Sequence, residues 1–154
     1  MSFDLSRIPS VATASEAGHS FEPVYPGTTQ PIGATITVRG PRSAAVRDHA
    51  RRKYGQAQAR EQAARKIGRP SDPMQLDELE ESLVELAVVY TVGWAGIDQA
   101  GAAVPFSAEA ARQLYTDHPW IREQVIEQAQ DLGKFIRPSA KNSSSTPPPS
   151  FTST

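Results

Sequence analysis

Large apolar residues recur at alternating intervals of three and four between positions 76 and 90, and this spacing constrains the fold more than any other feature. The positions are Leu76, Leu79, Leu83, Leu86 and Tyr90. An α-helix places residues with this spacing on one face. Asp72, then Pro73 and Gln75, match a helix N-terminus, and Gly93 ends the run. The sequence therefore predicts a helix over residues 72–92 whose apolar face must be covered by other elements.

Two shorter helices follow and can cover this face. Ser107 is placed to cap the first, with Leu114 and Tyr115 on its inner side, and Pro119 opens the second. The inner positions expected on the second helix are Ile121, Val125, Gln128, Leu132, Phe135 and Ile136. We expect the two to form a helical hairpin against residues 76–90, within a core domain spanning residues 70–137.

The segments before this core have different compositions. Residues 1–20 are small and polar and predict a flexible lead-in, whereas residues 21–40 predict a β-hairpin with strands at 21–25 and 34–38 around a turn rich in Pro, Gly and Thr. Residues 41–69 predict a basic helix that starts at Ser43. The predicted fold class is mainly α (α+β), with a core of three or four helices preceded by a β-hairpin.

The C-terminal segment is unsuited to a folded core. From position 138 onward, 13 of 17 residues are Ser, Thr or Pro. Such a composition buries too little apolar surface to offset the loss of chain entropy. Residues 138–154 are therefore predicted to be a disordered tail.

Charge is divided between two adjacent segments although the net charge of the chain is −1. Residues 39–69 hold ten Lys or Arg and two acids, and residues 72–98 hold seven acids and no Lys or Arg. The basic side chains nearest each other are those of Arg47, Arg51, Arg52 and Lys53. They can bind phosphates or pair with the acidic segment. No compact base-reading motif surrounds this helix, so we prefer the second interpretation and expect no nucleic-acid partner.

The sequence offers little for catalysis or metal binding. There is no cysteine, and His19, His49 and His118 lack the spacing of a helical metal site. No nucleophile elbow, phosphate-binding loop or dinucleotide motif occurs. We expect a non-enzymatic protein with no catalytic residues, metal or cofactor. No apolar stretch is long enough to cross a bilayer, and the N-terminus has no leader pattern, so we expect a soluble protein that does not contact membranes.

A series of aromatic and proline positions carries a more specific signal. The series comprises Gly93-Trp94-Ala95-Gly96, Val104-Pro105-Phe106-Ser107, Leu114-Tyr115 and Pro119-Trp120-Ile121. In order and spacing it resembles the tail assembly chaperones of long-tailed, siphovirus-like bacteriophages. In these small helical proteins a Trp-Gly turn precedes a Pro-Phe helix start and a last helix containing proline. The resemblance extends over residues 76–136.

The resemblance implies a function in virus assembly. Such chaperones act in the host cytoplasm, bind the tape measure protein, recruit tail tube protein and leave before the virion matures. By this resemblance, Trp94, Phe106, Tyr115 and Trp120 would form or flank the partner-binding surface, and self-association is possible. Two alternatives remain open: a structural tail or connector protein of the virion, and a small nucleic-acid-binding regulator that uses the Arg-rich helix.

Overall fold

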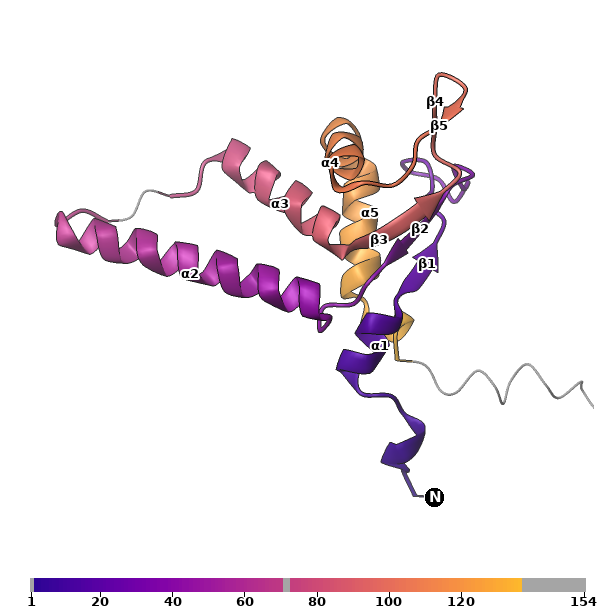
Figure 1. Ribbon diagram of the computed structural model, residues 1–154, viewed down its shortest axis with the longest axis horizontal. Helices are drawn as coiled ribbons and strands as arrows, with labels where there is room; N and C mark the ends of the chain where they lie inside the picture. The colour runs from indigo at the N-terminus through magenta and orange to yellow at the C-terminus, as the bar shows by residue number, and fades with distance from the viewer. Residues whose placement is uncertain (1, 71–72, 137–154) are drawn as a thin grey trace, which may run out of the picture.

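The computed structural model describes residues 2–70 and 73–136, and the predicted tail at 138–154 lies outside them. Within the described residues the chain forms helices packed on a small antiparallel sheet (Figure 1). The longer elements are α1 (Val11–Ala17), β1 (His19–Phe21), β2 (Thr35–Val38), α2 (Ala44–Lys66), α3 (Leu76–Tyr90), β3 (Thr91–Ala95), α4 (Ala108–Asp117) and α5 (Pro119–Gln130). The short ones are the 3₁₀ turns Leu5–Arg7 and Leu132–Lys134 and the strands β4 (Asp98–Gln99) and β5 (Ala102–Ala103). The prediction of a mainly α fold with a small β component is confirmed.

The main sheet has three antiparallel strands in the order β1-β2-β3. Ile36 of the central strand lies opposite Phe21 on one side and Trp94 on the other. Ile36 and Val38 are fully buried while Thr35 and Thr37 are half-buried, so the predicted alternation is confirmed. The predicted hairpin is only part of the sheet, however. Its first strand lies at 19–21 rather than 21–25, and the third strand comes from a segment that the sequence assigned to the end of a helix and a loop.

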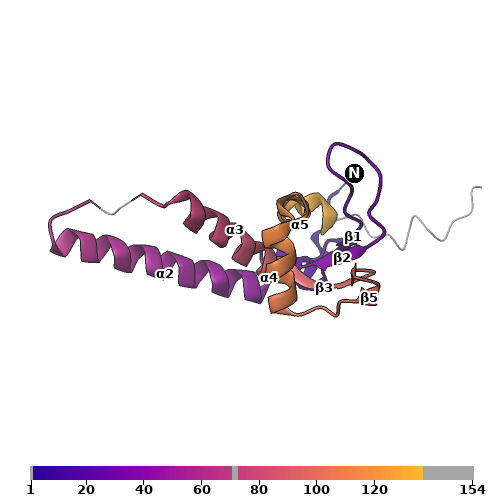
Figure 2. The ribbon, with the colours of Figure 1, turned by 90° about the horizontal axis from the view of Figure 1, so that it is seen from above.

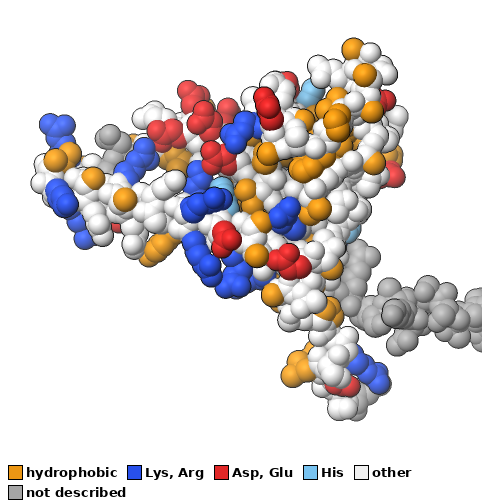
Figure 3. All heavy atoms as spheres, viewed as in Figure 1, with side chains coloured by type: hydrophobic (Ala, Val, Ile, Leu, Met, Phe, Trp, Pro, Cys, Tyr) orange, Lys and Arg blue, Asp and Glu red, His pale blue; other side chains and the backbone are white. Residues whose placement is uncertain are grey.

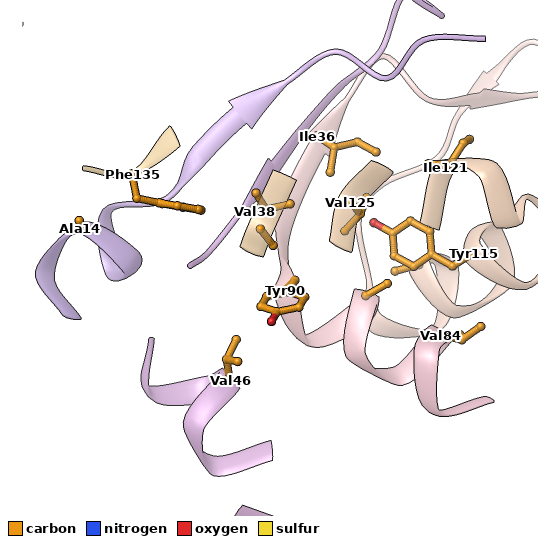
Figure 4. Packing of buried hydrophobic residues seen from close by; sticks show 13 residues of the cluster. Ala14, Ile36, Val38, Val46, Val84, Tyr90, Tyr115, Ile121, Val125 and Phe135 are labelled. Carbon is orange, nitrogen blue, oxygen red and sulfur yellow. The ribbon is translucent and has the colours of Figure 1, made fainter. Parts of the chain in front are cut away.

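Helix α3 packs its C-terminal half against α4 and α5, which form the expected helical hairpin. Thirteen buried hydrophobic residues from α1, α2, α3, α4, α5, β2 and the segment after α5 form one cluster, and Val38, Tyr90, Tyr115 and Val125 lie near its middle (Figure 4). On α3 the buried residues are Val84, Ala87 and Tyr90. The predicted stripe is therefore wrong at its start, because Leu76 and Leu79 are 70% and 45% exposed.

The start of α3 also differs from the prediction. The helix begins at Leu76 with Gln75 at the N-cap position, so Pro73 precedes the helix instead of occupying its first turn, and Asp72 is not among the described residues. The N-terminal half of α3 has no core beside it. It extends away from the sheet together with the distal half of α2, and we call residues 54–70 and 73–82 the arm (Figures 1 and 2).

Helix α1 replaces part of the predicted flexible lead-in and holds the connection between β2 and α2. Ser15 is fully buried, its carbonyl accepts a hydrogen bond from the Gly40 amide at 3.0 Å, and its Oγ accepts one from the Arg42 amide at 3.2 Å. A Cβ atom on Gly40 would collide with Ser15. The Glu16 carboxylate accepts a hydrogen bond from the Ala44 amide. The first turn of α2 is therefore capped from α1, because Ser43, at the predicted N-cap position, makes no side-chain cap bond.

The last two helices begin as predicted. The Ser107 side chain accepts a hydrogen bond from the Ala110 amide at 3.0 Å, and Pro119 occupies the first turn of α5. The second helix ends earlier than expected, and Leu132 lies in a 3₁₀ turn with 44% of its surface exposed rather than on the inner face. Phe135 is buried, as predicted. Among the described residues, no helix has both the length and the apolar character needed to cross a membrane.

Candidate functional site

Tyr115, one of the four aromatic residues singled out from the sequence, lies entirely in the core. Its hydroxyl is 2.6 Å from Thr91 Oγ1, and Thr91 Oγ1 donates to the Ala87 carbonyl at 2.7 Å. Because that bond uses the only Thr91 proton, Tyr115 must be the donor to Thr91. Burial raises the pKa of Tyr115 to about 12. Tyr115 therefore joins α4 to the junction of α3 and β3, and it contributes nothing to the surface.

Trp94 and Phe106 form a pair at the edge of the fold. Their ring centroids are 5.0 Å apart in an edge-to-face arrangement, and both side chains are half-buried. Trp94 Nε1 donates to the Val104 carbonyl at 2.8 Å, which fixes the ring against the segment that leads into α4. A shallow cavity of about 270 Å³ lies beside Trp94 and is also lined by Leu114 and His118.

Trp120 belongs to a second aromatic group. Its half-buried ring stacks on Tyr25 with centroids 6.2 Å apart and meets the edge of His118 at 6.1 Å. The Gln124 side chain holds the Tyr25 loop on α5, since it accepts from the Val24 amide and donates to the Val24 carbonyl, both at 2.9 Å. The structure thus brings Trp94 and Phe106 together, places Trp120 in a separate group and buries Tyr115.

The most exposed large apolar side chains in the helical part of the molecule lie on the arm. They are Ile67 and Leu76, at 69% and 70% exposure, with Tyr54, Met74 and Leu79 at 67%, 54% and 45%. Sequence reasoning missed this surface, because it assigned Leu76 and Leu79 to the covered stripe. A signal was present, since acidic residues surround Leu76 and Leu79 and the additional apolar positions begin only at Leu83.

Ion pairs connect the two helices of the arm at its base. Lys53 Nζ lies 2.7 Å from Glu85 Oε2, and Arg60 lies 3.5 Å from Glu78. The hydrogen bond from Lys53 lowers the pKa of the Glu85 carboxyl. A cavity of about 380 Å³ lies between the helices and is lined by Ala57 and Met74 as well as by these charged groups. The expected attraction between the basic and acidic segments is therefore observed for Lys53 and Arg60.

The remaining residues of the predicted basic surface stay open to solvent. Arg47, Arg51 and Arg52 are exposed, and Arg51 has only a surface pair with Asp48 at 3.4 Å. Lys and Arg side chains gather along α2 while Asp and Glu side chains gather over α3 (Figure 3). Arg47 and Arg52 make no ion pair with any described residue.

The three histidines occupy unrelated places. His19 lies 3.1 Å from the Gln128 side chain, and His118 contacts Trp120. His49 is 9% exposed at the base of α2, and burial, followed by the nearby charge of Lys53, lowers its pKa. In residues 2–70 and 73–136 no cluster of three or more His, Asp or Glu side chains could hold a metal ion.

A cavity of about 410 Å³ lies between α3, α4 and α5 and has charge of opposite sign on its two sides. Asp77, Glu80 and Glu81 line it from α3, and Arg112 and Arg122 line it from α4 and α5. Arg122 is only 7% exposed, and its Nε has no hydrogen-bond partner. The two sides attract each other across the cavity and favour the packing of α3 on the helical hairpin.

Comparison with known proteins gives one match. A sequence model described as YdaY prophage protein matches residues 41–143, which include α2 through α5 but not α1, β1 and β2. A search of curated proteins and a search of solved structures found no match. The matched segment covers more than half of the 154 residues. The chain therefore belongs to the YdaY prophage protein family and is a phage-derived protein.

Proposed function

We propose that this phage protein is a non-enzymatic tail assembly chaperone that binds the tape measure protein and helps to recruit tail tube subunits. The observation that carries the proposal is the arm, where Ile67, Met74 and Leu76 are each more than half exposed. Several large apolar side chains exposed on one projecting element are typical of sites where proteins bind one another. A chaperone for a long helical partner needs such a surface, because it must shield apolar side chains reversibly.

The arm suits a helical partner in particular. An amphipathic helix binds by placing its apolar face along a hydrophobic surface, with contacts that repeat every three or four residues. Leu76 and Leu79 present apolar contacts at this spacing, and the acidic residues between and beside them can orient a partner by charge. The pairs of Trp94 with Phe106 and of Trp120 with Tyr25 lie on the folded body and offer a second, smaller contact area for tail tube protein.

The proposal includes where the protein acts. It acts in the host cytoplasm before the tail is complete, and it is absent from the mature virion. This distinguishes a chaperone from a structural tail or connector protein, which would remain in purified particles in stoichiometric amount.

Co-expression with the tape measure protein of the same phage tests the proposal. The wild-type chain should keep the tape measure protein soluble and co-purify with it. Leu79→Gln should weaken the complex about 3- to 10-fold, since full burial of an exposed leucine contributes ~1.5–3 kcal/mol and Leu79 is 45% exposed before binding. Leu132→Gln is the matched control, because Leu132 is 44% exposed and Leu79 45%, but Leu132 lies outside the arm. The proposal would be contradicted if the tape measure protein stayed insoluble with the wild-type chain, or if both variants lost the same amount of affinity for it.

A further inference from the structure

A cleft at the start of α2 brings cationic and aromatic side chains together. It has a volume of about 360 Å³ and lies between the first turns of α2, the end of α3 and the start of α4. Arg39 and Arg52 line it with Asp48, and Phe106, Val88 and Val89 supply an apolar wall. None of these side chains belongs to the arm.

The two arginines that line this cleft, Arg39 and Arg52, make no ion pair with any described residue. Arg60 and Arg65, farther along α2, are both paired. Arg39 is half-buried, and its Nε is buried without a hydrogen-bond partner. A guanidinium in such a place gains from an external anion, because desolvation without a partner is costly.

The arrangement suits a chain of anions rather than one small anion. Arg52 lines the cleft from α2, and Arg39, at the end of β2, lines it from another element. Cations spaced along a path favour a polyanion, because each phosphate that they neutralise releases a counterion.

The apolar wall identifies the kind of polyanion. Proteins that bind single-stranded nucleic acid combine a positive groove with aromatic rings on which bases stack. Phe106 provides such a ring beside Arg39 and Arg52 in one cleft. A duplex keeps its base faces stacked inside and would leave Phe106 unused, and an acidic polypeptide carries no planar base. We propose that this cleft binds single-stranded nucleic acid, with phosphates on Arg39 and Arg52 and a base against Phe106. This inference shares Phe106 with the contact area proposed for tail tube protein, but it does not rest on the chaperone proposal.

Fluorescence anisotropy with a labelled oligothymidine of about 16 nucleotides tests the inference on the full chain. Arg39→Gln/Arg52→Gln should lower the affinity more than about tenfold and reduce the salt slope by about 1.4, since each phosphate contact contributes about 0.7 for a single strand. Arg65→Gln/Lys66→Gln is the matched control, because it removes the same charge at the far end of α2. It should change the affinity less than about twofold.

Phe106→Leu separates base contact from charge. It keeps an apolar side chain against Trp94 but removes the ring, and it should lower the affinity about 5- to 100-fold while the salt slope stays unchanged. The inference would be overturned if the protein did not bind the oligonucleotide at low salt, or if the two charge variants lost affinity equally. It would also be overturned if Phe106→Leu left the affinity unchanged and the protein bound duplex DNA equally well. Displacement of the oligonucleotide by polyglutamate at equal charge concentration would overturn it in favour of an acidic polypeptide.

Discussion

Removal of the Thr91 hydroxyl should destabilise the protein more than removal of the hydroxyl of its partner, Tyr115. Both residues are almost completely buried, Tyr115 donates to Thr91 Oγ1 at 2.6 Å, and Thr91 donates to the Ala87 carbonyl at 2.7 Å. In Tyr115→Phe, Thr91 keeps its donor bond and no buried donor is left unpaired. We expect a loss of ~0.5–1.5 kcal/mol in the free energy of unfolding.

Thr91→Val has a different consequence because it leaves the buried Tyr115 hydroxyl without an acceptor. The Ala87 carbonyl still accepts the Thr91 backbone amide, so the main cost is the unpaired phenol, ~1–3 kcal/mol. In the double variant neither hydroxyl remains, and its stability should be close to that of Tyr115→Phe alone. The coupling between the two substitutions should therefore be about 1 kcal/mol or more.

Urea unfolding of the four proteins, followed by far-ultraviolet circular dichroism, measures this coupling. The slope m should stay constant, so that differences in midpoint report stability. If the two losses simply add, or if Tyr115→Phe costs more than Thr91→Val, the assignment of Tyr115 as donor in a buried hydrogen bond is wrong.

Three other predictions concern stability. Glu16→Ala should lower the free energy of unfolding by ~0.5–2 kcal/mol, because it removes the cap of α2. Ser43→Ala should leave the free energy of unfolding unchanged or raise it, because Ser43 Oγ is buried without a partner. Equal losses in the urea midpoints of the two variants would refute this. Val125→Ala should lower the free energy of unfolding by about 2 kcal/mol, because Val125 is fully buried. Leu76→Ala should lower it by less than about 0.5 kcal/mol, because Leu76 is 70% exposed. Thermal and urea unfolding can check both values. The lowered pKa of His49 means that the unfolded chain binds its proton more tightly, so stability should fall as the pH drops below 6.5 and be unaffected by His49 above it. His49→Gln should flatten the change in urea midpoint between about pH 7.5 and about pH 5.5, and an unchanged pH profile would exclude His49 as its source.

The parts of the fold that depend on local signals were predictable. Ser107 and Pro119 mark the starts of α4 and α5, and the alternation of Ile36 and Val38 marks the buried face of β2. These features need only the residues within one or two turns. The mainly α class with a small β component follows from them.

Features that depend on contacts distant in sequence were not predictable. Thr91–Ala95 becomes a strand because it pairs with β2, more than 50 residues earlier, and its glycine and short length give little local indication of this. The capping of Ala44 by Glu16 likewise joins segments 28 residues apart. In such cases a partner that the local pattern does not contain decides the structure.

The candidate site was predicted only in part for the same reason. Helical spacing identified Leu76 and Leu79 as one apolar face, but the positions of α4 and α5 decide which turns of that face are covered. The spacing of aromatics likewise did not distinguish Tyr115, which is buried, from Trp94 and Phe106, which are half-buried. The charge division indicated pairing between α2 and α3, and among the residues that the structure describes this pairing involves Lys53 and Arg60.

Deletion of the gene from the prophage that encodes this chain, followed by induction and electron microscopy of the lysate, tests the chaperone function most directly. The account predicts filled heads without tails, rescue by the wild-type chain and by Leu132→Gln, and little rescue by Leu79→Gln. It also predicts that purified wild-type virions lack the protein. Normal tails in the deletion strain would contradict the proposed function.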